Sequence, residues 1–120
     1  MDKWSAIIYG EAASKANSRQ LVTIKGRPAL IKSVKARLFE RAAHLQLQVA
    51  ELKKPISGPV SATLRIYYTT ERPDLDESVV LDVLQGYAYL NDRQVREKHV
   101  FHGIDKVRPR VEIEVVPLVR

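Results

Sequence analysis

The sequence predicts a small α/β domain of the α+β type, with a mixed β-sheet and two helices packed on one face. The 120-residue chain fits one domain (1–120), because two domains of half that length would each have a marginal core. Hydrophobic residues make up 45%, an ordinary fraction for a globular protein. They recur with the helical period in two segments and alternate in others, so that strands and helices interleave along the chain.

The chain begins with a short strand and an irregular basic segment. Trp4 to Tyr9 forms a short apolar run typical of a strand. Residues 11–33 are polar and basic around the apolar run Leu21 to Ile24. The turn-forming residues 25–28 (Lys-Gly-Arg-Pro) follow, so we expect a loop or an irregular hairpin here rather than a helix.

An amphipathic helix is predicted from Val34 to Leu52. Ser33 stands at its N-cap position and Pro55 follows its end. Its apolar residues recur every three or four positions, and its outer face carries Lys35, Arg37 and Arg41. The apolar set is Val34, Leu38, Ala42, Leu45, Val49 and Leu52.

The second half of the chain predicts three strands and one more helix. Residues 60–69 alternate between apolar and polar side chains, as in a half-buried strand. A helix is expected over 76–85, closed by Gly86. Two strands follow, over 95–101 and 111–116.

The composition excludes several classes of protein. Without cysteine there is no disulfide framework, no thiolate nucleophile and no cysteine-ligated metal. No apolar run is long enough to span a bilayer, and the first residues do not resemble a signal peptide. We therefore expect a soluble protein of a reducing cytoplasm, without a membrane partner.

The positive charge is unevenly distributed. The net charge of +6 divides into +7 for residues 1–56 and −1 for residues 57–120. A basic region beside an acidic one suits an enzyme that binds phosphates with the first and cations with the second. Solubilising surface charge explains the composition equally well.

Three aspartates are candidate metal ligands. Asp74 and Asp76 flank the start of the second helix, and Asp92 follows that helix at a turn. Carboxylates two residues apart can converge on one hard cation, especially with a third acid from another segment. The alternative is local: Asp74 with Glu77 resembles a helix N-cap and capping box, and Asn91-Asp92 resembles a turn.

Three segments resemble the RusA family of Holliday-junction resolvases, small phage and prophage endonucleases. Residues 14–33 (from Ser-Lys-Ala-Asn-Ser-Arg to Ile-Lys-Ser) resemble the basic N-terminal segment of its phage-type members. Arg72-Pro73-Asp74-Leu75-Asp76, with the helix that contains Leu81-Asp82, resembles the acidic signature. Residues 89–95 (Tyr-Leu-Asn-Asp-Arg-Gln-Val) resemble the segment that holds the remaining essential acid, so that the acidic active-site segment covers about 72–96.

The resemblance implies a homodimer that binds four-way DNA junctions and makes paired nicks with Mg²⁺ or Mn²⁺. Asp74, Asp76 and Asp92 would then be the catalytic metal ligands. The family signature has Asn where this chain has Glu77, and a helix lysine that residues 78–80 do not provide. The role of that lysine must be absent here or supplied by another base, for which Lys98 and the N-terminal segment are candidates. The candidate phosphate contacts are Lys15, Arg19, Lys25, Arg27, Lys32, Arg93 and Arg96.

Two other functions remain open from the sequence. One is a branched-DNA-binding protein without catalysis, in which the acids only cap helices. The other is an interaction protein whose charge has no role with nucleic acid.

Four tyrosines are expected in the core or at sheet edges: Tyr67, Tyr68, Tyr87 and Tyr89. Tyr87–Leu90 and the last strand are guesses for the dimer surface.

Overall fold

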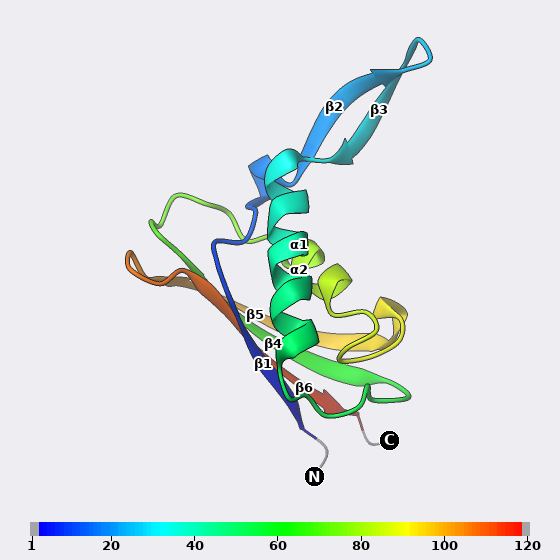
Figure 1. The fold of residues 1–120 in the computed structure, drawn as a ribbon, viewed down its shortest axis with the longest axis vertical. Helices are drawn as coiled ribbons and strands as arrows, with labels where there is room; N and C mark the ends of the chain where they lie inside the picture. Colours follow the sequence, from blue (N-terminus) through cyan, green and yellow to red (C-terminus); the bar gives the residue numbers. More distant parts are fainter. Residues whose placement is uncertain (1–2, 119–120) are drawn as a thin grey trace.

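The protein is described by a computed structural model that covers residues 3–118 (Figure 1). Its elements in chain order are β1 (Trp4–Tyr9), η1 (Lys15–Asn17), β2 (Arg19–Ile24), β3 (Arg27–Lys32), α1 (Val34–Val49), β4 (Val60–Tyr68), α2 (Glu77–Val83), η2 (Asp92–Gln94), β5 (Val95–Ile104) and β6 (Arg110–Pro117). This order confirms the predicted α+β class and every predicted strand and helix. Several bounds differ by a few residues, as for α1, which ends at Val49 rather than Leu52.

Four strands form a mixed sheet in the order β1-β6-β4-β5. Strands β1 and β4 each pair antiparallel with β6, and β5 pairs parallel with β4. β4 is therefore central, and its alternate residues Val60, Ala62, Leu64, Ile66 and Tyr68 are all fully buried. The parallel pair requires a crossover, and α2 with the following loop supplies it.

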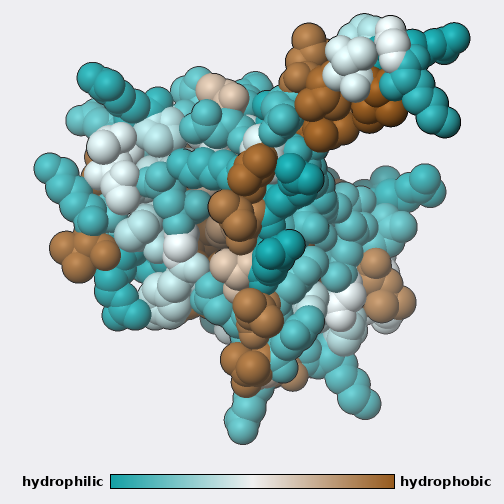
Figure 2. All heavy atoms as spheres, turned by 45° about the horizontal axis from the view of Figure 1, so that its top comes forward, coloured by the Kyte–Doolittle hydropathy of each residue, from teal (hydrophilic) through white to brown (hydrophobic). Residues whose placement is uncertain are grey.

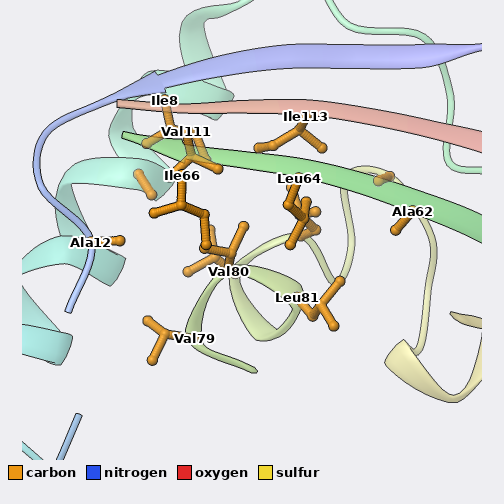
Figure 3. Packing of buried hydrophobic residues seen from close by; sticks show 14 of the residues in the cluster. Ile8, Ala12, Ala62, Leu64, Ile66, Val79, Val80, Leu81, Val111 and Ile113 are labelled. Atoms are coloured by element: carbon orange, nitrogen blue, oxygen red, sulfur yellow. The ribbon is translucent and has the colours of Figure 1, made fainter. Parts of the chain in front are cut away.

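The two helices lie on the same side of the sheet (Figure 1). Helix α2 covers the middle of the sheet, where Val80 points toward the side chains of β4, and Val79 and Leu81 belong to the same hydrophobic core (Figure 3). Each fully buried aliphatic side chain of this kind contributes roughly 1.5–3 kcal/mol to folding. The start of α2 is consequently held in one position against the sheet.

The inner face of α1 is not the one that the sequence predicts. Ser33 caps the helix as expected, by accepting a hydrogen bond from the Ala36 amide. The buried residues are Ala36, Phe39, Ala43 and Leu47, whereas Leu38, Leu45 and Val49 are 58%, 61% and 85% exposed. The prediction of the buried stripe was wrong because α1 has two apolar stripes. The stripe that contains Ala36 and Ala43 packs toward the sheet, because these small side chains allow close approach. The stripe with the larger side chains faces solvent.

Helix α2 is shorter than predicted and has a different cap. It covers 77–83, and its N-cap is Asp76, whose carboxylate accepts from the Ser78 amide. The predicted capping role of Asp74 was therefore wrong. Gly86, with a φ of 87°, follows the helix as expected for a residue that must leave the right-handed region.

The basic segment forms a regular hairpin that projects from the body of the protein (Figure 1). β2 and β3 pair only with each other and make a separate two-stranded sheet. Lys25 and Gly26 at its tip both have positive φ, of 50° and 77°, which is the geometry of a tight two-residue turn. The structure therefore confirms a hairpin here and shows that it is regular.

Within residues 3–118, none of the helices has the length and the apolar character required to cross a membrane.

Candidate functional site

Asp76 is an ionised carboxylate at the start of α2. It accepts hydrogen bonds from the backbone amide of Ser78, at 3.1 Å, and from the hydroxyls of Ser78 and Ser18. Burial by itself would raise the pKa of Asp76, but the hydrogen bonds from Ser18 and Ser78 outweigh it and hold the pKa below its ordinary value. Asp76 is therefore negatively charged at neutral pH and is fixed in place by its partners.

Asp74 lies two residues earlier, in the loop between β4 and α2, and its side chain is exposed. The backbone amide of Lys15 donates to the Asp74 carbonyl at 3.1 Å. This bond, together with that from Ser18 to Asp76, fixes the start of the basic segment beside the two carboxylates. The acidic and basic regions predicted from the sequence are thus direct neighbours.

Glu11 is a third acid in this region, and sequence reasoning missed it. Its carboxylate accepts from the backbone amide and the hydroxyl of Thr69, both at 2.8 Å, and from Lys35 at 3.2 Å. These bonds lower the pKa of Glu11 against the opposing effect of burial. Glu11 is the only acidic residue between positions 3 and 39, and that isolation within a basic segment is the signal that identifies it.

The buried phenol of Tyr68 lies among these acids. Burial raises the pKa of Tyr68 to about 12, and the negative charges of Asp76, Glu11 and Asp74 add to the rise. The same residue packs against the His102 imidazole, whose ring centroid lies 5.2 Å away. Tyr68 is therefore uncharged at neutral pH, and its buried side chain lies next to the three acidic residues.

Asp92 lies at the other end of α2. It begins η2, its backbone amide donates to the Gln85 side chain at 3.0 Å, and its own side chain is exposed. The seven residues of α2, at a rise of 1.5 Å each, are about 10 Å long and separate Asp76 from the turn that holds Gln85. Across residues 3–118, the structure accordingly groups no three acidic or histidine side chains closely enough to hold a metal ion.

A shallow cavity of about 250 Å³ lies along one side of α2, between the helix and the segment from Asp92 to Lys98. Ser78, which binds Asp76, lines this cavity together with Asp92. Lys98 lines the same cavity and donates to Glu77 at 2.8 Å. The hydrogen bond from Lys98 is the main reason why the pKa of Glu77 is lowered, so a positive charge lies beside Glu77, the residue that follows Asp76. We call Asp74 and Asp76 the acid pair.

The candidate phosphate contacts divide into four groups, three of which lie in the basic segment. Lys15 and Arg19 stand beside the acid pair, where the charge of Arg19 helps to lower the pKa of Asp76. Lys25 and Arg27 are exposed at the hairpin tip. Lys32 differs, because its ammonium group bonds to Glu40 and Asp82, both at 2.6 Å, and its charge is already compensated.

The two remaining candidates, Arg93 and Arg96, are exposed near Asp92. Arg96 lines the same cavity as Asp92 and Lys98. The exposed cations among the candidates therefore lie close to both ends of α2 and along the hairpin.

Comparison with known families gives one finding. The family model described as Endodeoxyribonuclease RusA matches residues 11–116 of the chain. The matched range includes the hairpin, both helices and all three candidate aspartates. A comparison with curated proteins gives no match.

Proposed function

The chain is an endodeoxyribonuclease of the RusA family, and on this premise we propose that it resolves four-way (Holliday) DNA junctions by paired, symmetric, metal-dependent nicks. We place this reaction in DNA recombination and repair, in the cytoplasm of a bacterial or phage-infected cell. The observation that carries the proposal is the contact between the basic segment and the acid pair, through Ser18 to Asp76 and Lys15 to Asp74. A nuclease needs this arrangement, because cations must hold the phosphate chain where carboxylates hold the catalytic ion.

Asp74 and Asp76 fit a Mg²⁺ or Mn²⁺ ion. Mg²⁺ prefers oxygen ligands and commonly takes one or two carboxylates, with waters and substrate phosphate oxygens completing its shell. Asp76 is ionised and Asp74 is exposed, so both can serve as ligands. When bound, such an ion lowers the pKa of a water molecule and neutralises charge that develops on the phosphate.

Asp92 remains a proposed third ligand, although the described chain does not bring it to the other two. Its exposed position beside Arg96 and Lys98 faces the same cavity as the start of α2. Its role is therefore tested by its own variant, separately from Asp74 and Asp76.

The cationic residues have two proposed roles. Lys15, Arg19, Lys25 and Arg27 hold DNA phosphates without reading sequence, with Arg93 and Arg96 at the far end of α2. Lys98 takes the place of the missing helix lysine, because it reaches the N-terminal turn of α2 from β5 and contacts Glu77. A contact to the phosphate or proton donation to the leaving oxygen would both be open to its ammonium group.

We further propose that the protein acts as a homodimer through the exposed stripe of α1. Leu38, Ala42, Leu45 and Val49 follow the alternating four- and three-residue spacing with which two helices pack side by side. A two-fold pair of subunits gives two active sites, which matches the two-fold symmetry of paired nicks.

The decisive experiment uses a labelled four-way junction in Mg²⁺ or in EDTA, resolved on a denaturing gel. We expect symmetric nicks from the wild type only with the metal, and none from Asp74→Asn, while junction binding by that variant persists. Glu114→Gln, which changes an exposed carboxylate on β6 outside the site, is the matched control and should nick normally. Junction binding by the wild type without any Mg²⁺-dependent nicking would replace the nuclease with a non-catalytic branched-DNA-binding protein.

A further inference from the structure

Two leucines on the projecting hairpin have no partner in the hydrophobic core. Leu21 of β2 and Leu30 of β3 are 72% and 68% exposed. They are directly paired in the hairpin register, so their side chains lie next to each other on one face. Single exposed leucines are common on protein surfaces, but an adjacent pair on an arm without a core of its own indicates a binding surface.

The leucine pair lies on the hairpin face that turns toward the helices. Arg19 and Lys32 are paired two positions closer to the hairpin base, and alternation places them on the same face as Leu21 and Leu30. The ammonium group of Lys32 bonds to Glu40 of α1 and Asp82 of α2, which fixes the direction of that face. Figure 2 shows the hairpin overhanging a recess in the surface, with apolar side chains gathered on the hairpin.

The positive charge near Leu21 and Leu30 favours a partner that is negatively charged. Residues 12–39 contain no acidic residue, and Lys25 and Arg27 extend beyond the leucines at the tip. A second copy carries the same basic arm, and two such arms would repel each other. DNA complements it, since phosphates attract the cations while the faces of the bases are apolar.

We propose that Leu21 and Leu30 form an apolar wedge that packs against exposed base faces at the branch point of a DNA junction. The inference rests on the proposed function, and it names the residues that distinguish branched from continuous DNA. In a continuous duplex the base faces are covered by stacking, and a side chain can reach them only if one step is unstacked, which is unfavourable. At a branch point the stack is already interrupted, so the wedge binds there without that cost and raises the affinity for junctions alone.

The test compares binding of a four-way junction and of a linear duplex of the same sequence, in EDTA so that no cleavage occurs. The variant Leu21→Thr/Leu30→Thr keeps the strand propensity of the hairpin and removes the apolar pair. We expect its affinity for the junction to fall about tenfold or more, as roughly 1.4 kcal/mol of apolar contact is lost. Affinity for the duplex and its salt dependence should stay unchanged, because every cation remains.

A fluorescent base analogue at the branch point gives a second readout. Its emission should change when the wild type binds and should not change with the double variant. Val107→Thr, at a residue that is 86% exposed in the β5–β6 turn, is the control and should behave as the wild type in both measurements.

Three outcomes would overturn the wedge: unchanged junction preference in the double variant, equal affinity of the wild type for junction and duplex, or dissociation of an oligomer as the sole effect of the variant. The last would assign the leucines to a protein interface. Failure of the wild type to nick in Mg²⁺ would contradict the proposed nuclease instead, and it would leave the result of the binding comparison in EDTA valid.

Discussion

At the scale of single residues, Asp76 combines two roles that substitution can separate. It caps α2 and it is a proposed metal ligand. Asparagine is as good an N-cap as aspartate, whereas alanine cannot accept the hydrogen bond from Ser78. Catalysis and stability should therefore respond differently to the two substitutions.

We predict that Asp76→Asn abolishes Mg²⁺-dependent nicking and lowers stability less than Asp76→Ala does, because the amide keeps the cap and loses only the charge. Asp76→Ala should also abolish nicking and should lower the free energy of unfolding by about 1 kcal/mol. Junction nicking and urea denaturation measure the two effects. Full nicking by Asp76→Asn would remove Asp76 from the metal site.

The hydrogen bond from Ser18 to Asp76 predicts a pH-dependent stability. The pKa of Asp76 in the folded protein lies below its ordinary value of 3.8, so the ionised form is the one that folding stabilises. That stabilisation is present above the unfolded value and is lost as the pH falls through the folded value. Ser18→Ala should lower the free energy of unfolding by about 1 kcal/mol at pH 7.

The difference between wild type and Ser18→Ala should shrink as the pH falls below 3.8 and through the lowered pKa of Asp76 in the folded protein. Denaturant titrations at several pH values measure it. Ser57→Ala, at an exposed loop position, should show no such dependence. A constant difference across the pH range would mean that Ser18 stabilises the fold through packing or through its hydrogen bond to the Ser14 carbonyl, and not through Asp76.

At the scale of elements, the hairpin is anchored by Lys32, and this changes what its cations contribute to DNA binding. Lys32 already bonds to Glu40 and Asp82, whereas Lys25 and Arg27 extend into solvent at the tip. Only cations that release counterions from DNA contribute to the salt dependence of binding.

We predict that Lys25→Ala and Arg27→Ala each reduce the slope of log affinity against log salt by about one. Lys32→Ala should reduce it by less. Binding to the labelled junction across a salt series measures the slopes. An equal reduction for all three would show that Lys32 leaves its carboxylate partners to bind a phosphate.

Helix α1 shows how far the sequence predicts an element and where it stops. The period, the Ser33 cap and the approximate ends could all be predicted, because they depend on local chemistry. The choice of inner face could not, since both stripes are apolar and the outer one has the larger side chains. Ala36 and Ala43 are buried because the helix lies close to its neighbours, and that is a property of the tertiary packing.

The candidate site shows the same division. The pairing of Asp74 with Asp76 could be predicted because they are two residues apart. The charge distribution suggested that the basic segment lies beside them, although 58 residues separate Ser18 from Asp76. The distance between Asp92 and the other two aspartates depends on the length of α2 and on the loop that follows it. The sequence around Asn91-Asp92 predicts a turn but not where that turn lies relative to Asp76. Glu11 joins the site only because β1 and β4 both end beside the start of β6, where Thr69 meets it.

At the scale of the whole molecule, the exposed surface suggests how two subunits would meet. Leu38, Leu45 and Val49 form a line on α1, and Figure 2 shows apolar side chains running down the molecule from the hairpin. Helix α1 has 16 residues and is about 24 Å long. Two such helices related by a two-fold axis would cover each other's stripes, with Ala42 allowing close approach.

We predict that the wild type is a dimer in solution and that Leu38→Glu/Leu45→Glu is a folded monomer. Both leucines are more than half exposed, so charge there disrupts association and not the core. Light scattering after gel filtration measures the mass, and circular dichroism checks the fold.

On a supercoiled plasmid with a cruciform, the dimer should yield linear DNA by paired nicks, and the monomer should yield nicked circles. Val107→Glu is the control for added charge and should stay dimeric. A double variant that remains dimeric would exclude the stripe on α1, and a monomeric wild type would exclude the proposed dimer.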